Sequence, residues 1–212
     1  MKGRALHASI NQIEVGTLQE VDGLWRFQYD ADWLGSRDGF ALSPDLPLTG
    51  EPLLDGASKR PVQWYFDNLL PEEGQRVLLA GDAKLDAADG FGLLAWYGAE
   101  SAGSVTLLHA DDQPQTTAAL RPLSDDALEA RIRQLPKAPL TQAAIKRMSL
   151  AGAQHKLAVV LHDDELFEPA GATPSTHILK PDQSKRSWLG RFWVCGTSRI
   201  STGMCCCSQV LR

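Results

Sequence analysis

Two short segments of this sequence carry residues that could hold a phosphate group. Residues 148–160 read MSLAGAQHKLAVV, so a loop of small residues at 151–153 comes directly before an apolar run. Gly152 can adopt dihedral angles closed to other residues, which lets the backbone N–H groups of such a loop point at phosphate oxygens. Residues 176–181 read THILKP, in which an apolar strand ends at Lys180. A flexible loop followed by a strand lysine predicts a site for a nucleoside triphosphate.

Matches spread along the chain point to a known family. The loop resembles the SxAGAQxK loop of the HipA-type serine/threonine kinases, the toxins of bacterial toxin–antitoxin modules, and residues 171–181 resemble that family's GxTPxTHIxKP strand. Three upstream segments, 27–34, 42–48 and 68–72, resemble the first N-terminal subdomain of the family. The matches keep the order that they have in the family and span residues 4–182, so the chain is similar to the N-terminal part of such a kinase.

The resemblance assigns residues to a nucleotide site that takes ATP with Mg²⁺. It implies that Lys180 contacts the phosphates and that Lys156 is a second, weaker candidate. His155 stands where the family commonly has glutamate, so we expect the loop to act through its backbone there. The assigned loop residues are Ala151, Gly152, Ala153, Gln154, His155 and Lys156.

Ser149 stands at the place of the family's autophosphorylated serine. A phosphate there adds about two negative charges, which would repel the phosphates of a nucleotide. The alternative is that Ser149 ends or caps a helix, and this reading suits a chain that lacks the lobe needed for autophosphorylation.

The sequence predicts no catalytic residue and no metal ligand. Phosphoryl transfer needs one carboxylate to orient the attacking hydroxyl and another to hold magnesium. The family supplies both from its C-terminal lobe, and the 212 residues contain no HRD-like or DFG-like segment. We therefore expect a kinase truncated before its catalytic lobe, inactive on its own.

Composition is typical of a globular, cytoplasmic protein, with a net charge of −5 and 43% apolar residues. There is no apolar run of about 18 residues, as a membrane-spanning helix needs, and no signal-peptide pattern. The acidic balance argues against direct nucleic-acid binding. By resemblance, the expected partners are a HipB-like DNA-binding antitoxin and a protein substrate such as an aminoacyl-tRNA synthetase.

The hydrophobic pattern predicts an α+β fold in which an N-terminal HipA subdomain precedes an incomplete kinase-like N-lobe. Strands are expected at 4–10 and 13–18 around an Asn-Gln turn, and Ser124 is expected to cap a helix. Pro71 is expected to open a helix that runs to residue 80. The expected parts are the first subdomain at 1–110, a polar linker at 111–121, a partial N-lobe at 122–182 and a tail at 183–212.

The tail differs from the rest of the chain. Five of the 21 basic residues and none of the 26 acidic ones follow Asp182, so the tail carries +5 and the preceding residues −10. All four cysteines lie in the tail, three of them adjacent, which is not a zinc spacing. A foreign or frameshifted sequence and a divergent, disordered end both explain this, and in either case we expect the tail to lie outside the folded core.

A second hypothesis for the whole chain is a non-catalytic binding module, or an antitoxin-like partner of a separately encoded HipA-type kinase. A gene split would fall at the linker 111–121, so the presence of the loop and Lys180 beyond it argues against this alternative. Co-purification with a neighbouring kinase would favour the module, and an intact downstream reading frame for the missing lobe would favour truncation.

Overall fold

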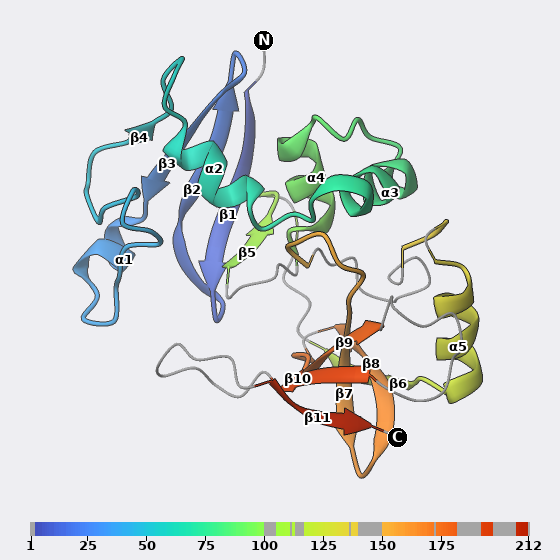
Figure 1. Cartoon of the computed structure of the whole chain (residues 1–212). Coiled ribbons are helices and arrows are strands. Elements are labelled where there is room, and N and C mark those ends of the chain that lie inside the picture. The colour runs from blue at the N-terminus through green and yellow to red at the C-terminus, as the bar shows by residue number, and fades with distance from the viewer. Residues whose placement is uncertain are drawn as a thin grey trace. The chain divides into compact units, whose positions relative to one another are not determined.

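The computed structural model divides the chain into two compact units (Figure 1). The first unit comprises Met1–Pro114 and Arg147–Gly152, and the second unit comprises Gln115–Lys146 and Ala153–Arg212. The first unit is therefore built from two separate stretches of sequence. The structure describes residues 3–99, 105–110, 112, 117–135, 137–139, 150–171, 173–181, 192–196 and 207–211, with the backbone only for 181, 192–196 and 207–211.

An antiparallel sheet of order β4-β3-β2-β1-β5 forms the first unit. The hairpin expected around Asn11 and Gln12 is confirmed, and both turn residues have positive φ, of 52° and 67°. A second turn at Asp22 and Gly23 has the same property, which is the backbone shape that matches the twist of two paired strands. The strands are β1 (Arg4–Ile10), β2 (Ile13–Val21), β3 (Leu24–Tyr29), β4 (Leu53–Leu54) and β5 (Val105–Leu108).

Side chains accept hydrogen bonds from the first turns of three of the four described helices of the first unit. Asp30 caps α1 (Ala31–Gly35), and Asp89 caps α4 (Gly90–Tyr97) by accepting from the Gly92 N–H. Arg60, at the start of α2 (Pro61–Asp67), provides no such cap. The buried Asp55, which precedes α2 in the sequence, caps this helix instead. Its carboxylate accepts hydrogen bonds from the N–H groups of Val62 and Gln63 at 2.9 and 3.0 Å. The remaining helix, α3 (Glu73–Ala83), starts two residues after the expected position at Pro71.

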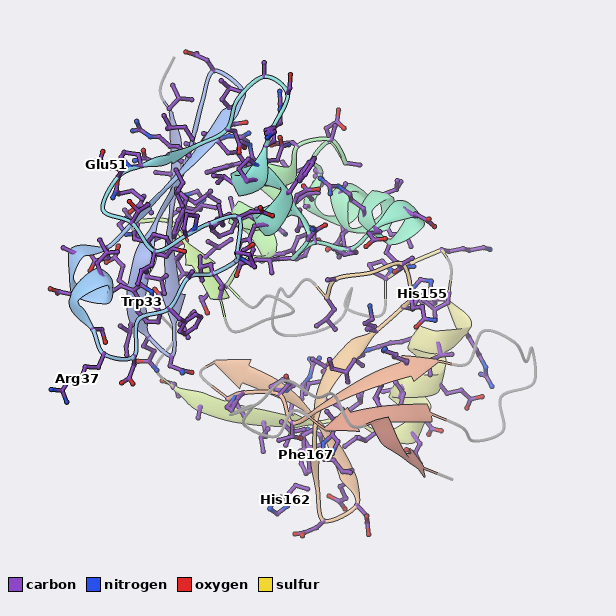
Figure 2. All side chains as sticks on the ribbon, turned by 60° about the vertical axis from the view of Figure 1, so that its left-hand side comes forward. Trp33, Arg37, Glu51, His155, His162 and Phe167 are labelled. Carbon is purple, nitrogen blue, oxygen red and sulfur yellow. The ribbon has the colours of Figure 1, made fainter. Side chains whose placement is uncertain are left out.

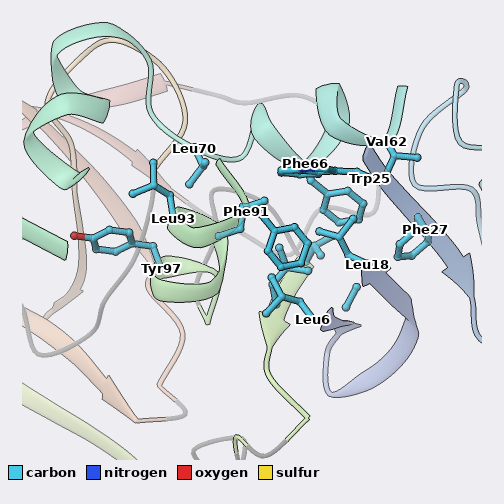
Figure 3. Packing of buried hydrophobic residues seen from close by; sticks show 14 of the residues in the cluster. Leu6, Leu18, Trp25, Phe27, Val62, Phe66, Leu70, Phe91, Leu93 and Tyr97 are labelled. Atoms are coloured by element: carbon cyan, nitrogen blue, oxygen red, sulfur yellow. The ribbon is translucent and has the colours of Figure 1, made fainter. Parts of the chain in front are cut away.

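The core of the first unit lies between the sheet and its helices (Figure 3). Alternate strand residues such as Leu6, Leu18 and Phe27 are fully buried, as period-two patterning requires. Phe66 of α2 packs on Phe27, and Phe91 of α4 meets Trp25 edge-on, each with ring centroids 5.3 Å apart. These aromatic contacts attach the helices to the sheet.

The second unit is a sheet of order β11-β10-β9-β7-β8-β6 with one described helix. Ser124 caps α5 (Asp125–Arg133), as expected, by accepting from the Ala127 N–H. Leu128 and Ile132 of this helix pack on Leu157, Val159 and Leu179 of the sheet. The strands are β6 (Ala118–Pro122), β7 (Leu157–His162), β8 (Glu165–Gly171), β9 (His177–Pro181), β10 (Phe192–Gly196) and β11 (Cys207–Leu211).

Strands occur within both the expected linker and the expected tail. Residues 118–121 of the expected linker belong to β6, an exposed edge strand that pairs with β8 through its backbone and needs no apolar side chains. In the expected disordered tail, β10 pairs with β9 and β11 pairs with β10. The β-prone residues of 192–196 satisfy the backbone groups that β9 would otherwise leave unpaired at an edge. The rest of 183–212 lies outside the described residues.

Among the described residues, no helix is long and apolar enough to cross a membrane.

Candidate phosphate-binding site

Strand pairing brings the two candidate lysines together in the second unit. β7 follows the loop directly and runs antiparallel to β9, with Leu157 opposite Leu179 and Ala158 opposite Ile178. Lys156 precedes Leu157 and Lys180 follows Leu179, so the same register places the lysines opposite each other at one end of the strand pair. Sequence spacing alone did not indicate this pairing.

The two lysines share the face of the sheet away from α5. Leu157 and Leu179 project into the core that α5 covers, and successive strand residues alternate between faces. By this alternation Lys180 projects to the other face, and we infer the same for Lys156, which directly precedes β7; both are half-buried. Like charges directly opposite each other on paired strands repel. Two cationic side chains at this end of the strand pair could also attract an anion such as phosphate.

The loop itself is divided between the two units. Ala151 and Gly152 group with the first unit, whereas Ala153, Gln154, His155 and Lys156 group with the second. Gly152 has a φ of 96°, a conformation that only glycine adopts without strain, and it forms an isolated parallel bridge with Pro71. Ala153 and Gln154 are exposed. Ser149 lies outside the described residues.

His155 is buried, with 6% of its surface exposed. Burial lowers the pKa of its imidazole, so the ring is neutral at pH 7 and adds no positive charge. Figure 2 shows His155 and His162 near opposite ends of β7.

A buried ion cluster that sequence reasoning missed lies on the α5 face of the same sheet. Glu168 of β8 is 2% exposed and accepts from Arg131 of α5 at 2.5 Å and from Nε of Arg121 of β6 at 2.7 Å. Burial alone would raise the pKa of Glu168, but hydrogen bonds and charge from the two arginines outweigh it and leave the pKa below its ordinary value. The only signal in the sequence was an acid inside an otherwise apolar strand.

The described acids do not form a magnesium site. Glu168 is fully engaged by its arginines. Asp163 and Asp164 form an exposed hairpin turn with φ values of 50° and 61°, where water solvates them. The described part of the chain contains no group of three or more His, Cys, Asp or Glu that could hold a metal ion.

The chain is similar to known proteins in both sequence and structure. Residues 6–108 match the family model of the HipA N-terminal domain. The chain is 37% identical over 170 residues to Y4mE of Sinorhizobium fredii, a protein named as a candidate kinase; the match covers 77% of this chain and 39% of the relative. It is 30% identical over 154 residues to the serine/threonine-protein kinase toxin HipA of Shewanella oneidensis, covering 72% of this chain and 34% of the relative.

A solved structure shares the fold. A chain in the complex of HipA, HipB and operator DNA from the Shewanella oneidensis toxin–antitoxin system matches with a TM-score of 0.63 and 25% identity, covering 85% of this chain and 41% of that one. This chain spans about two fifths or less of the length of these relatives. The sequence and structural matches agree, and they show that the chain belongs to the HipA family and carries a HipA N-terminal domain at residues 6–108.

Proposed function

We propose that this chain contributes the N-terminal domain and the phosphate-binding half of a nucleotide site to a HipA-type protein serine/threonine kinase. The observation that carries the proposal is the placement of Lys180 opposite Lys156, where the loop meets β7. The loop backbone around Gly152 offers N–H groups to the phosphates of ATP, and the two lysines offset their charge. A kinase of this type would act in the cytoplasm with a HipB-type antitoxin as partner, on a protein substrate such as an aminoacyl-tRNA synthetase.

The residues of this chain would bind and orient the nucleotide without completing the transfer. The described residues contain no group of three or more His, Cys, Asp or Glu that could hold a metal ion. Without the metal and an enclosing wall, triphosphate affinity should stay near the millimolar range, or about −4 kcal/mol. We therefore expect the chain alone to be catalytically inactive, with no transfer of radiolabelled phosphate from ATP to itself or to another protein.

Nuclear magnetic resonance titration of the ¹⁵N-labelled chain with ATP tests the binding. We expect chemical-shift changes concentrated in residues 151–156, with an apparent Kd near the millimolar range that weakens as salt screens the lysines. Lys180→Ala should abolish the changes. Lys137→Ala removes the same charge from an exposed position elsewhere in the second unit and should leave them intact. Equal binding by the two variants would rule out the proposed site.

A non-catalytic module that binds a separately encoded HipA-type kinase is the second candidate function. It is favoured by one observation, namely that the family model matches only residues 6–108, which lie in the first unit. A module of this kind would form a stable complex with the kinase even when Lys180 is replaced by alanine. A wild-type chain that forms this complex but shows no ATP-dependent shifts would favour the module.

A further inference from the structure

The segment 68–72, which connects α2 to α3, has a rigid position in the first unit. The N–H groups of Leu69 and Leu70 donate to the carbonyl groups of Phe66 and Asp67 at 3.1 and 3.0 Å, which continues α2 as a tight turn. Leu70 is 1% exposed within the aromatic core, and Pro71 is also buried. The sequence pattern singled this segment out, yet none of its residues belongs to the phosphate-binding site described above.

An ion pair clamps the two helices that flank this segment. Arg76 of α3 donates twice to the carboxylate of Asp67 of α2, with both distances at 2.8 Å. Its Nε also donates to the carbonyl oxygen of Ala87 at 2.6 Å. Two parallel hydrogen bonds from a guanidinium to a carboxylate fix both the distance between the two groups and their relative orientation. The turn between α2 and α3 therefore has little freedom to move.

The phosphate loop is attached to this rigid turn at one point. Pro71 and Gly152 form an isolated parallel bridge, and both residues belong to the first unit. Pro71 has no N–H to donate, so the bridge must use backbone groups of the residues on either side of it. Gly152 has a φ of 96° at the point where it meets Pro71.

We propose that residues 68–72 support the phosphate loop and that Pro71 is a positioning residue for phosphate binding. The bridge holds the Gly152 backbone in its turned conformation before any ligand arrives, so that less ordering is needed on binding. The relevance to phosphate rests on the proposed function, whereas the attachment of the loop to the N-terminal domain does not. A change in residues 68–72 should then alter the loop without any contact to the ligand.

Hydrogen–deuterium exchange on the whole chain without nucleotide tests the attachment. Pro71→Gly should increase the exchange rate of the amides at 152–154 about tenfold, and leave the amides of β2 and β3 unchanged, because only a local contact is released. Pro47→Gly makes the same replacement at an exposed loop position of the first unit and should leave the loop amides unchanged. Equal loop exchange in the wild type and Pro71→Gly would overturn the proposal.

A reciprocal variant keeps the test decisive if Pro71→Gly fails to fold. Gly152→Ala is strained at the observed φ and should release the bridge from the loop side, which increases exchange at Glu72 with the core unaffected. No change at Glu72 would again overturn the proposal. ATP titration of Pro71→Gly then separates the two ideas. Faster loop exchange with weaker ATP binding supports both, whereas faster exchange in a chain that never binds ATP supports the attachment and rejects the proposed function.

Discussion

Replacing Glu168 by glutamine tests the ion cluster that joins β6, β8 and α5. The substitution keeps the shape of the side chain and removes its charge. Arg131, with 13% of its side chain exposed, then lacks its carboxylate in a dry environment, whereas Arg121, with 46% exposed, can turn toward water. Most of the effect should therefore come from Arg131.

The size of the effect follows from this difference in exposure. Removing one partner of a buried ion pair costs about 3–5 kcal/mol when the other partner stays buried. Because water can solvate Arg121, we expect the lower part of that range or slightly less, about 2–3 kcal/mol. For a chain of this size that corresponds to a fall in Tm of about 5–10 °C.

Acidification should reduce the difference between the two proteins. The folded pKa of Glu168 lies below its ordinary value of 4.5, so its contribution to stability is present above that pH and is lost as pH falls through the folded pKa. The wild type should lose this contribution in acid, and Glu168→Gln has none to lose. The gap in Tm should thus be largest at neutral pH.

Thermal unfolding followed by circular dichroism measures these effects at pH 7 and below pH 4.5. Glu165→Gln, on the same strand but exposed, is the matched control and should change Tm little. Adding Arg131→Met to Glu168→Gln should recover part of the loss, because the buried guanidinium that lost the carboxylate is then removed as well. If Glu168→Gln were as stable as Glu165→Gln at pH 7, the cluster would not stabilise the second unit and the reasoning would be refuted.

Two further predictions concern the first unit. Glu73 has a φ of 47°, which is strained for a residue with a side chain, so Glu73→Gly should raise the free energy of unfolding by about 0.5 kcal/mol or more. Glu72 has an ordinary φ of −104°, so Glu72→Gly should lower the free energy of unfolding by about 0.5–1 kcal/mol. Urea denaturation measures both changes, and the same sign for both would contradict the prediction. Asp55→Ala removes both caps of α2 and should cost about 1–2 kcal/mol in the same assay, whereas Asp45→Ala, at an exposed position, should cost almost nothing.

The parts of the fold that sequence could predict are those set by neighbouring residues. The Asn11–Gln12 turn and the Ser124 cap depend on local chemistry, and both were predicted correctly. Pro71 also gives a local signal, for a helix start. The signal misplaced the helix by two residues, because Pro71 pairs with Gly152 and α3 begins only after that bridge. The local preference of proline for a helix start did not decide the backbone conformation at Pro71, which pairs with a residue far along the chain.

The same limit explains what sequence missed in the candidate site. The loop and Lys180 are visible as motifs, but the pairing of Lys156 with Lys180 depends on the register of two strands. Glu168 and Asp55 look like ordinary surface acids, since their partners lie in other elements. Composition also did not indicate the strand at residues 192–196, because that strand depends on pairing with β9.

The division of the first unit into Met1–Pro114 and Arg147–Gly152 has a consequence for protein synthesis. Domains of a nascent chain fold as units as they leave the ribosome, beginning at the N-terminus. The bridge between Pro71 and Gly152 can form only after Gly152 has been synthesised. Gly152 follows residues 115–146, which belong to the second unit. A gene split or premature stop between residues 111 and 121 would therefore release a first unit in which Pro71 never meets its partner.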